Sequence, residues 1–396
     1  MNHKSILKNI VLNIYKMNPH IDFTSNADDI MTFTLSGVNV SLANGLRRTI
    51  LSDIPSVVFR TSPHEECKAI ILTNTSRLNN EILKQRLSCI PIHITDLKDF
   101  DYTKYIMELN VENISDTTMI VTTKDFVVKD IDTGKAISEA DTKKIFPPDS
   151  YTSDYIDFVR LRPRISEEIP GEKIHLTCEF SIGTCKQDGM FSAVSTCAYG
   201  FTVDEKEMEA KLNKKRKDWK DEGKTEKEIE EVESKNWKLL DGARIVKKDS
   251  FEFTIESVGV YTNTELLTAS CDILIRKLNE MDALIEEDRL KINISQNTMS
   301  NCFDIIMENE DYTIGKIIEY FLYAKFFEQE EEAKRVLTFC GFKKMHPHDT
   351  DSIIRVAYLE PTDRTTIKGH LKECIAGGIS VYEKCKKTFR NMTKNN

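Results

Sequence analysis

The stretch "NVSLANGLRRTILSDIP", residues 39–55, predicts a short strand that leads into an amphipathic helix, which a proline ends. Leu42, Leu46, Ile50 and Ile54 recur at every fourth position and therefore lie along one face of the helix. A short helix gains most of its stability by packing an apolar face against other elements. The stretch thus predicts a buried helix that needs a covering surface elsewhere in the chain.

Two adjacent arginines interrupt the apolar pattern of this helix. They are Arg47 and Arg48, and Asn44 precedes them by about one helical turn. One interpretation is a polar face in contact with solvent. The other is a surface that binds a partner, because the planar guanidinium group binds carboxylates and carbonyls with paired donors.

Length and composition set the class of the protein. The chain has 396 residues, of which 40% are hydrophobic and 30% charged, and these values are typical of two or three globular domains. A net charge of -9 disfavours a protein that holds duplex nucleic acid over a broad surface. No apolar run is long enough to span a membrane, and residues 1–18 lack the cleavage site of a signal peptide. We therefore expect an intracellular protein.

Neither a cofactor nor a metal is predicted. The chain has ten cysteines but no Cys-x-x-Cys pair, so we expect reduced thiols and no zinc site of standard spacing. Cys178, Cys185 and Cys197 are also spaced unlike a usual ligand run. The segment "HPHD", His346 to Asp349, is either part of a metal site or a turn between two strands, and the turn is favoured.

Catalytic motifs are missing from the sequence. It contains no P-loop, no Gly-rich dinucleotide fingerprint, no Gly-x-Ser-x-Gly elbow and no clustered aspartates of the kind that chelate catalytic magnesium. We predict no catalytic residues.

The composition and the hydrophobic pattern of the chain change along its length. Residues 20–40 predict two strands around a polar turn, and residues 56–203 contain many short apolar runs separated by turn residues, which is typical of a β-rich domain. Residues 204–242 are dominated by Lys and Glu and predict a solvated helix or a helical hairpin broken near Gly223. Within them, "KKRK" at 214–217 is either a nuclear-import signal or part of an exposed helix.

Strand and helix patterns return after the charged segment. Residues 250–259 alternate as a strand does, and Thr262 and Glu265 have the spacing of a capping box that starts a helix. A second strand and helix begin near residue 300, and another strand and a closing helix follow from residue 352. Four helices with one-sided apolar stripes are most economically buried against one another and against sheet faces.

The opening stretch closely resembles the signature helix of the α-like assembly subunits of multisubunit RNA polymerases. These are the N-terminal domain of the bacterial α subunit, its archaeal counterpart (archaeal D) and the eukaryotic third-largest subunit. The resemblance continues through "ILTNTSRLNNEILKQRLSCIPIHI" (71–94), "FSIGTCKQDGMFSAVSTCAY" (180–199) and "FEFTIESVGVYTNTELLTASCDIL" (251–274).

The last hundred residues resemble a smaller relative, the eukaryotic eleventh subunit or archaeal L. The resemblance is carried by "MENEDYTIGKIIEYFL" (307–322) and "FCGFKKMHPHDTDSIIRVAY" (339–358). In this family two α-like partners dimerise through their helices. Since both are present here, the chain resembles the fused form that large DNA viruses encode.

The resemblance implies an α+β fold in which two dimerisation halves, each a sheet with two helices, form a pseudo-dimer within one chain. The expected domains are an N-terminal extension (1–19), a discontinuous first half (20–55 and 243–290), a β-rich inserted domain (56–203), a charged helical insertion (204–242) and a second half (291–390). The expected internal interface consists of Leu42, Leu46, Ile50, Leu274, Ile314, Ile317, Ile318 and Phe321.

The implied function is that of a non-catalytic assembly scaffold of a DNA-directed RNA polymerase. It would dock the second-largest and then the largest subunit through Asn44, Arg47, Arg48 and Arg86, beside a small tenth-subunit-like protein. DNA contact would be indirect, and neither a membrane nor a homodimer is expected. The location would be the host cytoplasm and the virion for a viral protein, with the nucleus as the alternative.

Three alternatives stay open at this point. One is a nucleic-acid-binding module that uses the basic run at 211–220, against which the acidic net charge argues. A second is a hydrolase or transferase hidden in the β-rich insert, against which the missing catalytic motifs argue. The third is a diverged scaffold that pairs with a second copy instead of with its own second half.

Overall fold

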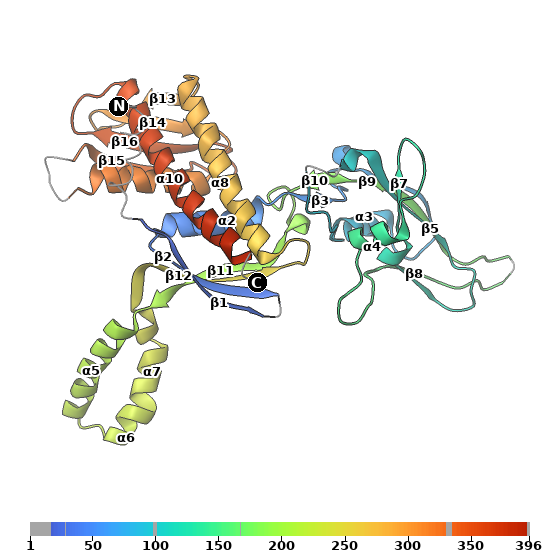
Figure 1. Cartoon of the computed structure of the whole chain (residues 1–396), viewed down its shortest axis with the longest axis horizontal. Helices are drawn as coiled ribbons and strands as arrows, with labels where there is room; N and C mark the ends of the chain where they lie inside the picture. The colour runs from blue at the N-terminus through green and yellow to red at the C-terminus, as the bar shows by residue number, and fades with distance from the viewer. Residues whose placement is uncertain (1–16, 28, 98–100, 167, 330–334, 394–396) are drawn as a thin grey trace. The chain divides into compact units, whose positions relative to one another are not determined.

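The computed structural model describes residues 17–27, 29–97, 101–166, 168–329 and 335–393. They form two compact units (Figure 1). Of these described residues, the first unit contains those up to Thr49 and those within 196–255 and 267–396, and the second contains those within 50–195 and 256–266. The predicted N-terminal extension lies outside the described residues, apart from Met17 to Pro19.

Two four-stranded sheets form the framework of the first unit. One has the order β1 (His20–Ala27), β2 (Ile30–Ser36), β12 (Val246–Ser257) and β11 (Val194–Val203). The other has the order β13 (Lys291–Ile294), β14 (Cys302–Met307), β16 (Ser352–Tyr358) and β15 (Leu337–Lys343).

The same sequence of elements occurs twice in this unit. Each sheet has two consecutive strands, then a helix, then two more consecutive strands and a second helix. In both sheets the spatial order is first, second, fourth and third strand. The four helices are α2 (Val40–Ser52), α8 (Asn263–Glu286), α9 (Tyr312–Leu322) and α10 (Arg364–Thr393). The first unit therefore contains two copies of one topology, and residues 56–193 interrupt the first copy between α2 and β11.

Alternation of apolar and polar residues fixes which face of β2 is buried. Met31, Phe33 and Leu35, at every second position, are buried. Phe33 stacks on Phe253 of β12 with ring centroids 5.1 Å apart and meets Phe389 of α10 edge-on at 5.7 Å. A helix of the second copy therefore covers the sheet of the first copy.

The starts of α8 and α9 follow from local capping chemistry. Glu265 Oε2 accepts from the backbone N–H of Thr262 at 2.8 Å, and the N–H of Glu265 donates to Thr262 Oγ1 at 3.3 Å, which confirms the predicted capping box. Asp311 is the N-cap of α9, since its Oδ1 accepts from the N–H of Thr313 at 2.8 Å.

The second unit is built on short strands, as the short apolar runs of its sequence predict. Its sheets have the orders β4-β9-β5-β7, β6-β8 and β10-β3, and helices α3 (Asn80–Ser88) and α4 (Glu139–Ile145) accompany them. The strands are β3 (Ser56–Val58), β4 (Ala69–Asn74), β5 (Tyr105–Glu112), β6 (Met119–Thr122), β7 (Val127–Asp130), β8 (Asp157–Leu161), β9 (Lys173–Glu179) and β10 (Ser181–Gly183).

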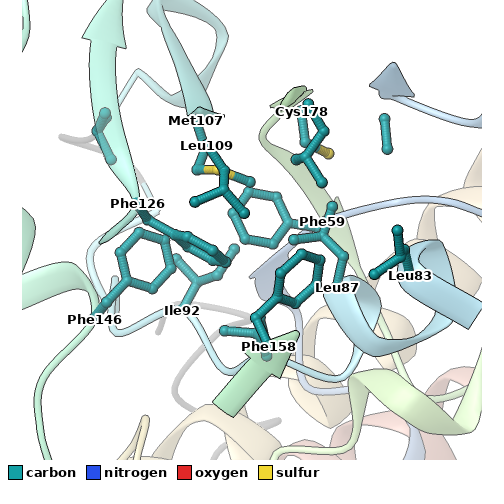
Figure 2. Close-up of a cluster of buried hydrophobic side chains, with 14 of the residues drawn as sticks. Phe59, Leu83, Leu87, Ile92, Met107, Leu109, Phe126, Phe146, Phe158 and Cys178 are labelled. Carbon is teal, nitrogen blue, oxygen red and sulfur yellow. The ribbon is translucent and has the colours of Figure 1, made fainter. Parts of the chain in front are cut away.

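Aliphatic side chains and several phenylalanine rings form the core of the second unit (Figure 2). Phe126 packs edge-on against Phe146 at 5.3 Å and Phe158 at 5.7 Å. Phe59 stacks on Phe146 at 6.1 Å. Edge-on and stacked pairs of this kind add to the free energy gained by burying the ring area.

The boundaries of the two units differ from the sequence-based expectation. Residues 50–55 and 256–266, which were expected in the first half, belong to the second unit. The predicted inserted domain extends to residue 203, but residues 196–203 of β11 belong to the first unit, where β11 pairs with β12. Local strand pattern does not reveal which sheet a strand joins, because that depends on a partner strand on the other side of the charged segment.

The charged segment forms a helical hairpin with a small core of its own (Figure 1). It consists of α5 (Glu205–Asp221), α6 (Glu226–Glu228), a π-helical turn (Ile229–Glu233) and α7 (Ser234–Leu239). Gly223 follows α5 with a φ of +88°, so the chain reverses near the predicted glycine. Leu212, Trp219 and Ile229 are buried between the helices. Among the described helices, none combines the length and the apolarity that crossing a lipid bilayer requires.

Candidate partner-binding site

The apolar face of α2 is buried against helices of the second topological copy. A Cβ atom on Gly45 would lie only 2.8 Å from Tyr382 Oη of α10 and 3.0 Å from Ile317 Cδ1 of α9, so a side chain at this position would force the helices apart. Tyr382 Oη donates to the carbonyl of Leu42 at 3.0 Å. Burial raises the pKa of Tyr382 well above its ordinary value, so the hydroxyl keeps the proton that it donates.

Helices α8 and α10 are joined in the same way. Gly378 of α10 allows close approach, since a Cβ there would lie 3.1 Å from Leu278 Cδ1. Lys372 Nζ pairs with Glu286 at 3.0 Å at one end of the contact, and Lys386 pairs with Asp272 nearer the other. All eight residues of the expected internal interface are buried: Leu42, Leu46, Ile50, Leu274, Ile314, Ile317, Ile318 and Phe321.

Arg48 connects the two copies. Its Nε donates to Thr313 Oγ1 at 3.0 Å, and its Nη2 donates to Asp311 Oδ2 at 3.1 Å. The same carboxylate caps α9 through its other oxygen, so Arg48 holds the start of α9 against α2. The side chain of Arg48 remains 35% exposed. This guanidinium therefore has a structural partner inside the chain.

Arg47 is in a different situation. Its Nε donates to Asn44 Oδ1 at 2.9 Å, which holds the guanidinium along the surface of α2. Within the part of the chain that the structure describes, no carboxylate pairs with Arg47. Its positive charge acts on Cys197 and Tyr199 of β11, where it opposes the rise in pKa that burial causes. A partly exposed and oriented guanidinium of this kind is suited to a carboxylate or carbonyl group from another protein.

Arg86 belongs to the second unit, where it joins α3 to β8. Its Nε donates to the carbonyl of Phe158 and its Nη2 to the carbonyl of Asp157, both at 2.7 Å. The structure therefore brings Asn44 and Arg47 together, occupies Arg48 with Asp311, and gives Arg86 backbone partners. Sequence reasoning missed the bond between Arg48 and Asp311, which are 263 positions apart. Asp311 carried the local signal of a helix cap and none of an arginine partner.

The described residues contain no group of three or more His, Cys, Asp or Glu side chains arranged to hold a metal ion. The segment His346 to Asp349 forms a turn between β15 and β16, as predicted. The N–H of Asp349 donates to the carbonyl of His346 at 3.0 Å, and the N–H of His346 donates to Asp349 Oδ2 at 2.9 Å.

Comparison with known families identifies this arrangement. The model of the RNA polymerase Rpb3/Rpb11 dimerisation domain matches residues 32–278, a range that includes α2, the inserted unit, the charged hairpin and the first turns of α8. The chain belongs to this family. It is an α-like RNA polymerase subunit with an α+β fold and no active site of its own. The matched range ends within α8, before the second topological copy begins.

Several relatives are RNA polymerase subunits. The chain is 27% identical to a subunit named as shared by RNA polymerases I and III of Dictyostelium discoideum, over 317 residues that cover 70% of this chain and 84% of the relative. It is 24% identical to subunit 3B of RNA polymerases IV and V of Arabidopsis thaliana, over 69% of this chain and 94% of the relative. A shorter match, 34% over 96 residues, covers 34% of the polymerase subunit Rpo3 of Pyrococcus horikoshii and 23% of this chain.

Proposed function

We propose that this chain is the assembly scaffold of a multisubunit DNA-directed RNA polymerase and carries both halves of the α-like dimer. Residues 20–55 and 243–290 would form the first half, and residues 291–390 the second. The observation that supports this is the repeated topology, in which both sheets have the same strand order and each has two helices. The buried contacts of α2 with α9 and α10 support it further, because they join one copy to the other.

Linking the two halves has a thermodynamic consequence. A covalent connection gives one half an effective concentration of about millimolar or more around the other. Pairing then does not depend on the concentration of the protein, as it does for two separate subunits. We therefore expect one copy per polymerase and no homodimer.

The docking surface that we propose is the polar face of α2. Arg47, oriented by Asn44, would bind the second-largest subunit, and the largest would follow. Arg48 would act mainly by fixing α9 against α2, and Arg86 by holding the second unit in shape for its own contacts. A small tenth-subunit-like protein would complete the platform, while DNA would be reached only through the large subunits.

Affinity purification of the tagged full-length chain from its native source, followed by native mass spectrometry, tests this proposal. One copy together with one largest and one second-largest subunit is the expected result. Two copies, or a separate small α-like partner, would show that residues 291–390 do not act as a dimerisation half. Recovery without large subunits would contradict the scaffold function itself.

The alternative of a nucleic-acid-binding module has weaker support. Its best candidate was the basic run in the hairpin, but Lys211 pairs with Glu207 at 2.7 Å, Arg216 with Glu209 at 3.2 Å, and Lys220 with Glu226 at 2.7 Å. Much of the positive charge is thus neutralised within the hairpin. An affinity of the isolated chain for DNA that falls steeply with salt would favour this alternative.

The cellular setting is part of the proposal. The fused arrangement is the ground for a viral polymerase acting in the host cytoplasm and packaged in the virion. The relatives named above are cellular subunits, which makes the nucleus the alternative. Fractionation of cells that make the tagged chain separates the two.

A further inference from the structure

The outer strands of the two sheets in the first unit are protected to different degrees. Natural proteins prevent an edge strand from pairing further by using charges, bulges or short strands. β1 carries a pair between His20 and Asp22 at 2.9 Å and a register shift after Phe23. β13 has 4 residues and begins with Lys291. β15 has a register shift after Leu337 and ends at Lys343.

β11 is neither short nor charged, so these two protections against pairing with another chain are missing from it. It has 10 residues, "VSTCAYGFTV", without a charged residue or a proline, and it is the last strand in its sheet. Residues 196–203 belong to the first unit. A long, uncharged edge strand of this kind is a template for pairing with another chain. We therefore expect this edge to be covered when the protein works.

An exposed aromatic surface lies along the same strand. Tyr199 packs on Phe251 of β12 at 5.2 Å, and Phe201 packs on Phe251 at 5.3 Å. Phe251 is fully buried, whereas Phe201 is 48% exposed. The aromatic row that begins in the core at Phe253 thus continues outward to solvent at the β11 edge. We call Tyr199 and Phe201 the aromatic ledge.

Arg47 is a cationic group in the same unit as this aromatic ledge. Its charge influences both Cys197 and Tyr199, so the guanidinium lies within electrostatic reach of β11. Arg47 and residues 196–203 of β11 belong to the same unit, so one partner can reach both the cationic group and the uncharged strand.

We infer that residues 196–203 of β11 accept an extended segment of a polymerase partner as an additional strand. Backbone hydrogen bonds supply affinity in this mode, and side chains at alternate positions supply specificity. The segment carries apolar side chains that cover the aromatic ledge and a carboxylate that reaches Arg47. This inference rests on the proposed function, because it takes the occupant to be a polymerase subunit.

Charge complementarity decides between a partner and a second copy of this chain. β11 of a second copy has no carboxylate to place beside Arg47, and the carboxylate of Asp204, which follows it, is engaged as the N-cap of α5, where it accepts from the N–H of Glu207 at 3.1 Å. Pairing of two β11 strands would leave the guanidinium without an acidic partner, whereas a segment of another protein with an acidic residue satisfies it.

The test compares two matched variants of the full-length tagged chain, Phe201→Glu and Phe23→Glu. Both phenylalanines lie on outer strands of the same sheet, at opposite edges, and they are 48% and 42% exposed. Phe201→Glu is expected to reduce recovery of the large subunits by about tenfold or more, which is the loss of one strong contact at an interface. Phe23→Glu is expected to recover them as the wild type does. Circular dichroism of each variant shows whether it is folded.

Hydrogen exchange gives a second readout that needs no variant. Backbone amides of residues 196–203 are expected to exchange more slowly in the purified polymerase than in the free chain, while those of β1 exchange equally in both. Normal recovery with Phe201→Glu and unchanged exchange at 196–203 would overturn the inference and leave the scaffold function intact. Protection of 196–203 in a homodimer of the free chain would overturn the choice of occupant. If the wild type recovers no large subunits, the proposed function fails, and the inference fails with it.

Discussion

Two neighbouring arginines on α2 make different contacts. Sequence reasoning treats Arg47 and Arg48 as a pair, because adjacency and identity give no ground to separate them. The structure separates them by partner: Arg48 binds the cap of α9, while Arg47 binds only the amide of Asn44 on its own helix, among the contacts described. The first contact joins α2 to the start of α9, and the second orients the guanidinium group that we propose as a docking group.

Alanine substitutions at the two positions should therefore affect different properties, stability for Arg48 and partner binding for Arg47. Arg48→Ala is expected to lower the free energy of unfolding by about 1 kcal/mol, a modest value because the ion pair is partly exposed. Arg47→Ala is expected to change it by less than about 0.5 kcal/mol but to reduce recovery of the large subunits. Urea denaturation and affinity purification measure the two effects. Equal destabilisation by both changes would contradict this division.

Charge introduced into the buried face of α2 should be far more damaging than charge on its polar face. Leu46 is 1% exposed and Ile318 is fully buried. Replacing either with aspartate buries an unpaired carboxylate, and we expect unfolding or aggregation, with a loss above about 4 kcal/mol. Circular dichroism and gel filtration are the measurements. Leu46→Met is the control, since a swap of similar volume usually costs less than about 1.5 kcal/mol.

A histidine on α10 makes the second copy sensitive to acid. Burial, and then the nearby charge of Lys325, lower the pKa of His370, whose ring packs on Phe326 and whose Nδ1 lies 3.1 Å from Tyr358 Oη. The unfolded chain binds this proton more readily, so the stability due to the neutral ring is complete above pH 6.5 and is lost as the pH falls below it.

Denaturation at about pH 7.5 and about pH 5, on either side of the ordinary histidine pKa, should show a larger loss of stability for the wild type than for His370→Gln. His93 in the second unit also has a pKa lowered by burial and contributes a loss of the same sign. The contribution of His370 is therefore the difference between the stability losses of the wild type and of the variant. Identical pH dependence of the two proteins would show that His370 is not responsible.

At the scale of elements, the charged hairpin is separable from the fold that carries it. The N–H of Asp204 donates to the carbonyl of Ile245 at 2.9 Å, so the chain leaves and rejoins the sheet at adjacent points. The buried residues of the hairpin contact one another in a small cluster of their own. These features are typical of an insertion between two strands of a β-hairpin.

Replacing residues 205–244 with Asn-Gly should therefore leave the remaining chain folded. Asn-Gly is the preferred sequence of a two-residue β-turn, and we expect the free energy of unfolding to change by less than about 1 kcal/mol. Calorimetry of the shortened chain measures this. Retained binding of the large subunits would show that the hairpin is not needed to bind them. Failure of the shortened chain to fold would show that the hairpin is part of the folding unit.

Local sequence patterns predict the helices, strands and turns well but do not predict which distant segments these contact. The two strands within residues 20–40, the capping box of Thr262 and Glu265 and the turn at His346 are predicted correctly, because each depends on residues a few positions apart. The sheet that β11 joins and the acidic partner of Arg48 are not. Both depend on segments brought together only by the whole fold, and no period in the sequence encodes them.

At the scale of the whole chain, the repeated topology predicts that the two halves can be separated and can recombine. When residues 17–288 and 289–393 are made as separate chains, we expect them to associate through the helices that are buried in the intact protein. The denaturation midpoint of the mixture should then rise with protein concentration, while that of the intact chain does not. A midpoint independent of concentration in both cases would contradict the pseudo-dimer.

The connection between the two topological copies also has a consequence for synthesis. When the two halves of a pair come from different genes, an excess of either leaves apolar helices without a cover. Here α2 and α10 are translated from one message in equal number, and the second half emerges from the ribosome beside a first half that is already present. If the two copies act as the proposed dimerisation halves, imbalance between gene products cannot leave one half without the other.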